Sequence, residues 1–500
     1  MKTMRNPEHD GGRIYIIGAG FAGRAIAREI KGKAVFGTVV AFIDDDAAKI
    51  GGKVEGVPVL GPIRDVVNLL RRTPADEAII AIPSATKEFL RDLYYMLKRA
   101  GFVRIRIVPG IAQIVEGDAH LIQAREIESQ DLLGRSPVAI GLKESLSYLR
   151  RKRVLITGAG GSIGSELSRQ LLSAGVERLY LFGHGENSIY QIDRELRLLR
   201  EEGVGERTTI VPLIGDLKDT DYMRFILGRL KADAVFHAAA YKHVPMMEEN
   251  PIAAVHNNVL GTRNLVEACL AASVRRFVLI STDKAVDPVS VYGASKLFAE
   301  RIVVDASSRA QPGREFMVVR FGNVLGSRGS IVPLFKRQIE KGGPVTVTHP
   351  EASRYFMTIP EACSLVLKTG GVGRSGQTYL LDMGEPVRIR DLAEQMIRFY
   401  GYEPGRDIKI EYIGLRHGER VEERLYSPEE VLVPTEYPRI NRLERRSKDS
   451  IELAKAIAEL EGFCLALPGR EKDYRNRRAL RAVLKKSVPA LIVPENESEY

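Results

Sequence analysis

Residues 153–165 read RVLITGAGGSIGS, a short apolar run that leads directly into a glycine-rich turn. Gly158, Gly161 and Gly164 are spaced by three, and they directly precede a helical pattern that Ser162 or Ser165 could cap. Small residues in such a turn let the backbone approach a pyrophosphate, and the N-terminus of the following helix offers free N–H groups. The stretch therefore predicts a strand, a turn and a helix that together bind a dinucleotide.

The residues that follow continue the alternation of strand and helix. Six strand-like runs are separated by helical patterns: RVLITG, RLYLFG, TTIVPLIGD, DAVFHAAA, RFVLIST and FMVVRFGNV. This alternation is typical of an α/β fold with a doubly wound, Rossmann-like parallel sheet. After about residue 330 the strands and helices become shorter, which predicts a smaller substrate lobe that includes the run TYLLDMG.

The N-terminal part repeats the same pattern and predicts a second Rossmann-like unit. Gly18, Gly20 and Gly23 follow the run RIYIIG, and Asp44 ends the next strand-like run. Asp44 lies a little further along than the ~20 positions of the dinucleotide fingerprint. A bound nucleotide and a purely structural, oligomer-forming role both fit these residues, and we assign this unit no catalysis.

The predicted organisation has five parts. They are a disordered tail over residues 1–11, the N-terminal nucleotide-fold domain over 12–128, a connector over 129–150, the main domain over 151–465, and a basic helix with a frayed polar tail over 466–500. The connector is expected where the alternation stops and Gly-Arg-Ser-Pro occurs.

The composition narrows the functional class. The 500 residues include 74 Lys and Arg against 64 Asp and Glu, a formal net charge of +10, and hydrophobic residues make up 44%. These are ordinary globular values, and three scattered cysteines rule out a disulfide scaffold or a cysteine-rich zinc site. No run approaches the ~18 apolar residues of a membrane helix. We expect a cytoplasmic protein, without nucleic acid or metal, that the basic stretch Arg470–Lys486 attaches at most peripherally to the inner membrane face.

Tyr292 and Lys296 stand four residues apart in YGASK, so they face the same way on a helix. A lysine ammonium beside a phenol favours the phenolate, which predicts a lowered pKa for Tyr292. Lys296 could also hold the nicotinamide ribose. Placed after the strand RFVLIST in a domain with a glycine turn, the pair predicts acid–base chemistry on a hydroxyl group.

Other candidate residues follow the remaining strands, where open α/β sheets place their ligands. The second strand ends in glycine. After it, His184 could meet a phosphate and Glu186 could meet a hydroxyl, so NADP remains an alternative to the preferred NAD. Asp216 follows the third strand, where an adenine contact is expected. Asp283 and Lys284 follow the fifth strand as an adjacent acid and base.

Several segments, read together, resemble one family. They are HAAAYKHVPMMEENP, NNVLGT, STDKAVDP, YGASK, RFGNVLGSRGSIVPLFKRQIEKGGPVTVTHP, SRYFMTIPEA, LDMGEPVRIRDLA and GLRHGERVEE. The chain resembles the nucleotide-sugar 4,6-dehydratases of the long, capsular-polysaccharide type, which are extended short-chain dehydrogenases acting on UDP-N-acetylglucosamine. GAGFAG, FIDDD and GVPVLG are similar to the extra domain of the long members, and DLLGR to their connector.

The resemblance implies roles for individual residues. Tyr292, supported by Lys296, would take the 4-OH proton, Lys284 would remove the C5 proton and Asp283 would protonate the departing 6-OH. This role requires a lowered pKa for Lys284, supplied by burial or by Lys296. The catalytic set is Thr282, Asp283, Lys284, Tyr292 and Lys296. The cofactor-binding set is Gly158, Gly161, Ser162, Ile163, Gly164, His184, Glu186, Asp216, Leu217, Ala238, Ala239, Tyr292 and Lys296. The substrate-binding set is Lys242, Asn323, Arg354, Arg416 and Glu419, with the two arginines as diphosphate clamps.

The sequence also departs from the resembled family. Long members usually begin with membrane helices, which this sequence lacks, and many carry Met where Tyr292 stands. GGPVTVTHP and RYFMTIPEA favour the group that retains the configuration at C5. A UDP-sugar epimerase on the same fold and a non-catalytic dinucleotide-sensing scaffold remain alternatives, and a homo-oligomer is expected.

Overall fold

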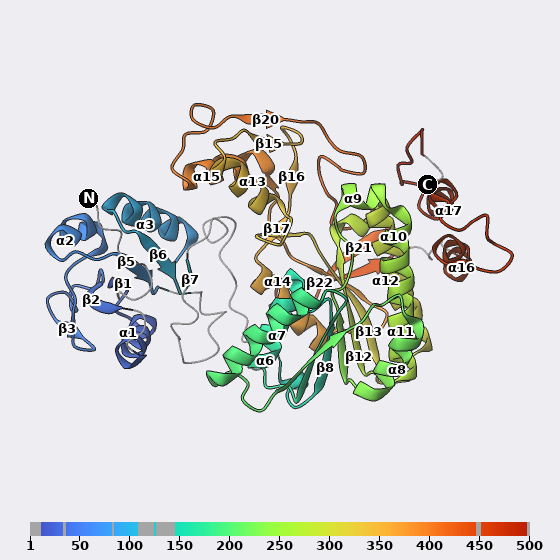
Figure 1. Cartoon of the computed structure of the whole chain (residues 1–500), viewed down its shortest axis with the longest axis horizontal. Helices are drawn as coiled ribbons and strands as arrows, with labels where there is room; N and C mark the ends of the chain where they lie inside the picture. Colours follow the sequence, from blue (N-terminus) through green and yellow to red (C-terminus); the bar gives the residue numbers. More distant parts are fainter. Residues whose placement is uncertain are drawn as a thin grey trace, which may run out of the picture. The chain divides into compact units, whose positions relative to one another are not determined.

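The computed structural model describes residues 12–33, 37–82, 85–108, 125–126, 146–446 and 452–497. It divides into two compact units, Met1–Gly141 and Leu142–Tyr500, and each has its own sheet (Figure 1). The predicted tail over residues 1–11 and most of the predicted connector lie outside the described residues.

The first unit is built on a five-stranded sheet in the order β2-β1-β5-β6-β7. Its strands are β1 (Arg13–Ile17), β2 (Thr38–Ile43), β5 (Glu77–Ile80), β6 (Arg104–Ile107) and β7 (Arg125–Glu126). All neighbours are parallel except β6 and β7. The short strands β3 (Lys53–Val54) and β4 (Val57–Pro58) pair outside this sheet. The predicted Rossmann-like alternation is therefore present.

The α-helices among the described residues of the first unit are α1 (Phe21–Lys33), α2 (Val66–Arg72) and α3 (Lys87–Ala100). Thr86 caps the N-terminus of α3, and Gly101 ends this helix in the left-handed region, at φ 106°. A buried cluster centred on Ile16, Ile26 and Phe42 forms the core between α1 and the sheet.

The second unit contains a nine-stranded sheet in the order β10-β9-β8-β11-β12-β13-β18-β22-β21. The six runs predicted from the sequence are β8 (Arg153–Thr157), β9 (Arg178–Gly183), β10 (Thr209–Ile214), β11 (Ala234–His237), β12 (Arg276–Thr282) and β13 (Glu315–Phe321). All of them pair in parallel, with the order reversing at β8. The carboxyl ends of β8 and β11 therefore form the switch point at which such sheets bind ligands.

The sheet is wider than the sequence predicted. TYLLDMG was assigned to the substrate lobe, but its strand β18 (Thr378–Leu381) is the next parallel strand beside β13. The strands β21 (Glu430–Pro434) and β22 (Ile440–Arg445) then close this edge in an antiparallel arrangement. The prediction was wrong because the order of strands in a sheet depends on long-range pairing, which a local apolar pattern does not encode.

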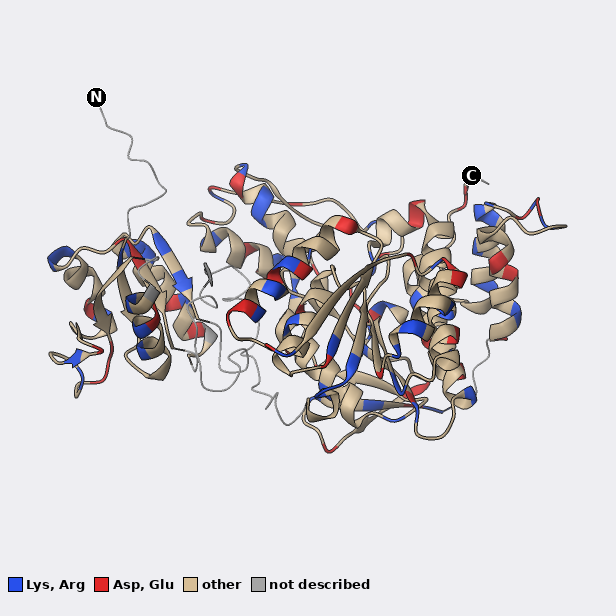
Figure 2. Cartoon of the chain, turned by 60° about the horizontal axis from the view of Figure 1, so that its bottom comes forward, with Lys and Arg blue, Asp and Glu red and all other residues tan. Residues whose placement is uncertain are grey.

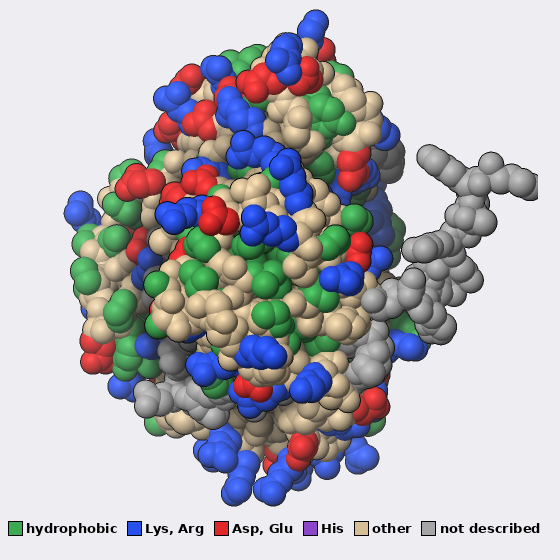
Figure 3. Space-filling model, turned by 90° about the vertical axis from the view of Figure 1, so that its left-hand side faces the viewer, with side chains coloured by type: hydrophobic (Ala, Val, Ile, Leu, Met, Phe, Trp, Pro, Cys, Tyr) green, Lys and Arg blue, Asp and Glu red, His purple; other side chains and the backbone are tan. Residues whose placement is uncertain are grey.

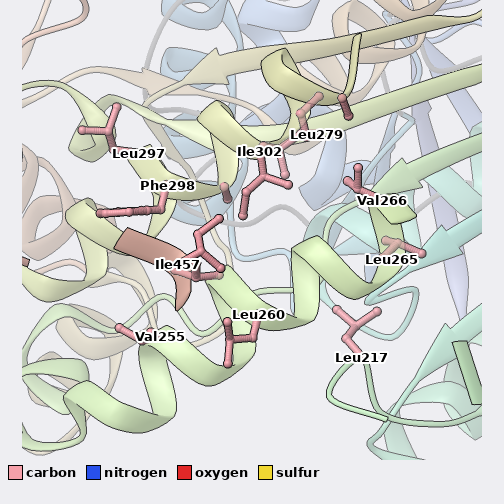
Figure 4. Close-up of a cluster of buried hydrophobic side chains, with 14 of the residues drawn as sticks. Leu217, Val255, Leu260, Leu265, Val266, Leu279, Leu297, Phe298, Ile302 and Ile457 are labelled. Atoms are coloured by element: carbon pink, nitrogen blue, oxygen red, sulfur yellow. The ribbon is translucent and has the colours of Figure 1, made fainter. Parts of the chain in front are cut away.

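The helices of the second unit cover the sheet and carry the site. Those before residue 330 are α6 (Ser162–Ser173), α7 (Glu186–Glu201), α8 (Thr220–Leu230), α9 (Val244–Glu249), α10 (Pro251–Val255), the π-helix η5 (His256–Leu260), α11 (Gly261–Ala271), the 3₁₀ turn η6 (Asp283–Ala285) and α12 (Val291–Arg309). Figure 4 shows apolar side chains of α10, α11 and α12, with Ile457 from beyond residue 450, meeting in one buried cluster.

The smaller lobe is formed by segments after residue 330, together with the short strand β14. It contains α13 (Ile331–Glu340), α15 (Ile389–Phe399), and the short strands β14 (Asn323–Val324), β15 (Val345–Val347), β16 (Ser353–Arg354), β17 (Phe356–Met357), β19 (Val387–Arg388) and β20 (Ile410–Tyr412). Helix α14 (Ile359–Val372) instead packs against α6 and the main sheet. The pairing of β14 with β17 holds Asn323 where β13 ends.

The C-terminal segment contains α17 (Arg477–Ser487), which lies in the stretch predicted as a basic helix. Together with α16 (Leu453–Cys464), it packs on α10 and α12. The tail was predicted to be frayed, but it is ordered up to Glu497. The Glu497 side chain is buried and pairs with Arg477 and Arg481 of α17. Among the described residues, no helix has both the length and the apolar character needed to cross a membrane.

Charged residues lie mainly on helices and loops, whereas the central strands of the large sheet are mostly uncharged (Figure 2). On the face that Figure 3 shows, basic side chains are interspersed with acidic and apolar ones. The excess of positive charge is thus distributed over this face rather than gathered in one stripe.

One buried ion cluster joins the sheet to α12. Arg320 of β13 donates to both carboxylate oxygens of Glu300 at 3.0 and 2.7 Å, and to those of Glu430 at 3.0 and 3.2 Å. Ser281 of β12 donates to Glu300 at 2.5 Å. The three ionised side chains are almost fully buried, so each depends on the others for its charge balance.

We predict that Arg320→Met lowers the free energy of unfolding of the second unit by about 3–5 kcal/mol, because it removes the buried cation that Glu300 and Glu430 share, while the partly exposed Arg445, 3.9 Å from Glu430, compensates only weakly. Arg309→Met is the control, because Arg309 pairs with Glu267 and Asp305 on an exposed surface, where a pair contributes ~0–1 kcal/mol. Thermal and urea unfolding, followed by circular dichroism, would measure both. Equal losses in the two variants would contradict a special role for the buried cluster.

Candidate active site

The glycine turn after β8 has the close approaches expected for a dinucleotide fold. A Cβ on Gly158 would lie 2.8 Å from the backbone of Ala239, and one on Gly164 would lie 2.1 Å from the carbonyl oxygen of Gly158. Gly158 also has φ +66°. The N-cap of α6 is Gly161, which offers no side chain to the first turn of the helix. The N–H groups there face the loop without a side-chain cap, as a bound pyrophosphate requires.

The residues predicted to contact the rest of a dinucleotide lie after neighbouring strands. His184 and Glu186 follow β9 and are exposed, and the His184 ring packs edge-on against Tyr241. Asp216 follows β10 and pairs with Lys218 at 3.1 Å. The other predicted members are Leu217, which is buried, and Ala238 and Ala239, which follow β11. The uncapped N-terminus of α6 and the residues that follow β9, β10 and β11 thus fit a dinucleotide bound at the carboxyl ends of these strands.

A loop residue that the sequence did not single out crosses the glycine turn. Arg328 donates its backbone N–H to Ser162 Oγ at 3.1 Å, and its guanidinium donates to the carbonyl oxygen of Gly160. Lys242 Nζ donates to the carbonyl oxygen of Arg328 at 2.8 Å. Burial and the nearby Arg328 lower the pKa of Lys242. The guanidinium of Arg328 therefore lies at the turn that would hold a pyrophosphate, and Lys242, from the loop after β11, contacts the backbone of Arg328.

The predicted catalytic residues of η6 form one hydrogen-bonded group. Thr282 Oγ1 donates to Asp283 Oδ1 at 2.8 Å, and Lys284 Nζ donates to the same oxygen at 3.1 Å. Lys284 Nζ also donates to Asn323 Oδ1 at 3.1 Å. Thr282 is hydrogen-bonded to the side chain of Tyr292 as well. The structure thus gathers five predicted residues in one group, namely Thr282, Asp283, Lys284 and Tyr292 of the catalytic set and Asn323 of the substrate-binding set.

Tyr292 lies in the first turn of α12, which Ser290 caps by accepting the N–H of Gly293. A Cβ on Gly293 would lie 2.2 Å from the carbonyl oxygen of Lys284, so glycine is needed for α12 to approach η6. Burial raises the pKa of Tyr292 to about 12, against the lowering effects of Lys284 and Thr282. The predicted lowering is therefore wrong for the protein without ligands, because burial outweighs the nearby positive charge.

Lys296 is one turn further along α12, and its Nζ donates to the carbonyl oxygen of Ile280 at 2.8 Å. Burial lowers the pKa of Lys296 to about 8, although Glu300 raises it. Burial and the charge of Lys296 lower the pKa of His237 to about 3. His237, held between Thr157 and Thr262, is thus a neutral structural residue beneath the site.

Lys284 has a further acidic neighbour that the sequence analysis did not identify. Glu423 Oε1 lies 3.5 Å from Lys284 Nζ, and the Glu423 side chain is only 6% exposed. Burial opposes the ammonium form, but the carboxylates of Asp283 and Glu423 outweigh it, and the pKa of Lys284 is raised. The predicted lowering of this pKa is wrong for the ligand-free protein. Glu423 is the last residue of the segment GLRHGERVEE, but the sequence analysis gave it no role, because its distance from Lys284 along the chain hides their contact.

One oxygen of Asp283 faces the site without a partner. Asp283 is fully buried, and its Oδ2 has no hydrogen bond among the described residues. A Cβ on Gly322 would lie 2.9 Å from this oxygen, so glycine at position 322 keeps the space beside it open. A buried, unsatisfied carboxylate oxygen is costly and is suited to accept a hydrogen bond from a ligand hydroxyl.

The predicted substrate-binding arginines occupy different positions. Arg354 donates to the carbonyl oxygens of Ser353, Arg420 and Val421, so it holds the loop that carries Glu423. Arg416 is 56% exposed and forms an ion pair with Glu419. Of the two, Arg416 is the one that can turn toward a diphosphate.

Comparison with known proteins agrees with this geometry. Residues 154–445 match the family model described as "Polysaccharide biosynthesis protein", and residues 2–109 match one described as "CoA-binding domain". The chain belongs to the family of polysaccharide biosynthesis proteins.

Two relatives in this family are similar over most of the chain. The "Probable polysaccharide biosynthesis protein EpsC" of Bacillus subtilis is 43% identical over 441 residues, which is 88% of this chain and 72% of that protein. The "Capsular polysaccharide biosynthesis protein CapD" of Staphylococcus aureus is 42% identical over 429 residues, 85% of this chain and 70% of its own. Among solved structures, Pen from Bacillus thuringiensis is 33% identical, with a TM-score of 0.54, over 61% of this chain and 90% of its own.

We predict that Gly164→Ala destabilises the second unit and abolishes dinucleotide binding, because the new methyl group would overlap the carbonyl oxygen of Gly158. Gly228→Ala in α8 is the matched control, because nothing lies within 4 Å of a Cβ there. Alanine at this helical position should stabilise by ~0.5–1 kcal/mol. Thermal unfolding and calorimetric titration with NAD would compare the variants. Unchanged NAD binding in Gly164→Ala would contradict the assignment of this turn.

We predict that Lys296 makes the stability of the cofactor-free protein rise as pH increases from about 8 to 10.5. In this window the unfolded chain keeps the proton of Lys296 while the folded protein has lost it, so the unfolded state binds more protons. Urea unfolding at several pH values should show this rise in the wild type and a smaller one in Lys296→Met. Parallel pH profiles would show that Lys296 titrates normally in the folded protein.

Proposed function

We propose that this protein is a nucleotide-sugar 4,6-dehydratase that uses NAD and converts UDP-N-acetylglucosamine into a UDP-4-keto-6-deoxy sugar. The observation that carries the proposal is the group formed by Asp283, Lys284 and Tyr292 at the carboxyl end of β12. Oxidation alone needs a tyrosine–lysine pair, whereas loss of water across C5 and C6 also needs an acid and a base. The site holds both within hydrogen-bonding distance of each other.

NAD, when bound at the glycine turn, supplies reversible hydride acceptance, so that the same hydride can leave C4 and return to C6. Tyr292 takes the proton of the sugar 4-hydroxyl in this step. The positive charge of Lys284 and the hydrogen bond from Thr282 both favour the phenolate of Tyr292. Burial of Tyr292 excludes water from the proton transfer.

The raised pKa of Lys284 sets a condition on the elimination step. A proton that moves from Lys284 Nζ to a carboxylate oxygen of Asp283 creates a neutral amine and a carboxylic acid together. The amine can then remove the C5 proton, which is acidic beside the C4 ketone, and the acid can protonate the departing 6-hydroxyl. Both residues return to their charged forms when water leaves, so protons balance over the step.

Binding of the sugar favours this internal proton transfer. A sugar ring over the cluster replaces water, and loss of water penalises the separated charges of Lys284 and Asp283 more than their neutral forms. Asn323 accepts from Lys284 Nζ in either form, and Glu423 lies on the other side. The unpartnered Oδ2 of Asp283 is the oxygen suited to meet the 6-hydroxyl.

We assign the nucleotide part of the substrate to loop residues. Arg416, paired with Glu419, is the proposed contact for the diphosphate, and Lys242, which contacts the backbone of Arg328, is a further proposed substrate contact. The activities named for several relatives support a UDP-sugar, among them a UDP-glucose 4-epimerase of Rickettsia typhi that is 31% identical over 67% of this chain. An epimerase is the competing activity, because it needs Tyr292 and Lys296 but not the acid–base pair of Asp283 and Lys284.

We predict that the purified protein removes water from UDP-N-acetylglucosamine without net consumption of NAD. Incubation with a panel of UDP- and dTDP-sugars, followed by mass spectrometry and by the absorbance of reduced cofactor, would measure both. Lys284→Ala should abolish loss of water yet still reduce bound NAD slowly, because oxidation at C4 precedes proton removal at C5. Lys336→Ala, an exposed lysine of α13, is the control and should behave as wild type.

Three outcomes would contradict the proposal. Reduced cofactor that accumulates in proportion to product indicates net oxidation. A product with unchanged mass but inverted C4 indicates an epimerase. If Lys284→Ala still removes water at a near-normal rate, Lys284 is not the C5 base.

A further inference from the structure

Glu248, in the last turns of α9, is a buried carboxylate whose two oxygens serve distant parts of the chain. Oε1 accepts the backbone N–H of Val291 at 2.7 Å, and Oε2 accepts from Arg481 at 2.6 Å. Val291 is the first residue of α12 and directly precedes Tyr292. The side chain that accepts the N–H of Val291 is thus held by the C-terminal helix α17.

Arg481 is as deeply buried as the carboxylate it binds. Its side chain is 1% exposed, and a second guanidinium N–H donates to the backbone carbonyl of Glu248 at 2.6 Å. Its Nε lies 2.5 Å from an oxygen of Glu497. Leu480 and Leu484 of the same helix are fully buried in the main core. The ion pairs are therefore shielded from water, where removal of one partner has large effects.

The C-terminal segment touches the entry to α12 at a second point. Ile492 donates its backbone N–H to the carbonyl oxygen of Val289 at 3.0 Å. Val289 precedes Ser290, the N-cap of α12. Residues 289–291 are thus held from the C-terminal segment directly and through Glu248.

The loop of Arg416 and Glu419 rests on the same carboxylate. Gly418 has φ +79°, and a Cβ there would lie 2.9 Å from Ser290 Cβ and 3.1 Å from Glu248 Oε1. His417 Nε2 lies 3.6 Å from Glu248 Oε2. The position of Glu248 therefore affects both the Tyr292 turn and the loop assigned to the diphosphate.

We propose that Arg481 is a positioning residue for the reaction, which acts through Glu248 to fix the first turn of α12 and with it the direction of the Tyr292 hydroxyl. The segment that supplies Arg481 lies beyond residue 445, where the match to the family model ends. The proposal rests on the proposed function, because Tyr292 must meet the sugar 4-hydroxyl for its direction to matter.

The first experiment isolates the step in which Tyr292 acts. A UDP-sugar that lacks the 6-hydroxyl can be oxidised at C4 but cannot lose water, so reduction of bound NAD reports hydride transfer alone. Arg481→Met should slow this reduction about tenfold to a hundredfold, because small misplacements of a reacting group have effects of this size. Deuterium at C4 should slow the variant by a larger factor than the wild type, since hydride transfer becomes more fully rate-limiting.

The controls separate positioning from loss of folded protein. Arg470→Met removes an arginine of the same segment that pairs with Asp473 and binds Ala458 and Glu459, without contact to Glu248. It should lower the melting temperature while the rate and the isotope effect stay as in the wild type. Glu248→Gln keeps an acceptor for Val291 and should retain more activity than Glu248→Ala. If Arg481→Met does not fold, the comparison of Glu248→Gln with Glu248→Ala tests the proposal instead.

Hydrogen exchange tests the linkage without any activity. The backbone amide of Val291 should exchange faster in Arg481→Met than in Arg470→Met, whereas amides in β8 should be unaffected. If the wild type shows no turnover but the two variants show this exchange pattern, the proposed function is refuted while the link between Arg481 and Val291 stands. Unchanged exchange at Val291 together with an unchanged rate and isotope effect in Arg481→Met would overturn the positioning role.

Discussion

The buried guanidinium of Arg320 is the constraint on which the arrangement of the site depends. It binds Glu300 of α12 and Glu430 of β21, and Glu300 also accepts from Ser281 of β12. Helix α12 carries Tyr292 and Lys296, and β12 leads directly into Asp283 and Lys284. One cation therefore fixes the helix and the strand that supply the two halves of the proposed chemistry. The cost of burying these charges is offset only while all three remain together.

Glycines at points of close backbone approach also shape the site. Gly293 brings α12 against the carbonyl of Lys284, and Gly322 leaves room beside the free oxygen of Asp283. Gly158 and Gly164 do the same at the dinucleotide turn. Each of these positions excludes a side chain for a steric reason, so the site is shaped by residues that themselves carry no chemistry. The ion clusters hold the elements, and the glycines set how near the elements come.

The protonation states show how far tertiary structure changes the chemistry of a motif. From the sequence, we expected Tyr292 beside Lys296 and Lys284 beside Asp283 to have lowered pKa values, so that each would lose its proton easily. In the structure, burial raises the pKa of Tyr292 to about 12, and two carboxylates raise that of Lys284. The proposed proton transfer from Lys284 to Asp283 reconciles these states with the elimination, because it forms the acid and the base at the same moment.

The sequence by itself determined the elements that depend on local pattern. Apolar runs of strand length, the glycine spacing of residues 158–164 and the four-residue interval between Tyr292 and Lys296 all express short-range geometry. Only the tertiary structure decided that β18, β21 and β22 extend the main sheet, and that Glu423, Arg328 and the Arg481–Glu248 pair reach the site. Those contacts join residues far apart in the chain, and the burial that sets their charge exists only once the chain has folded.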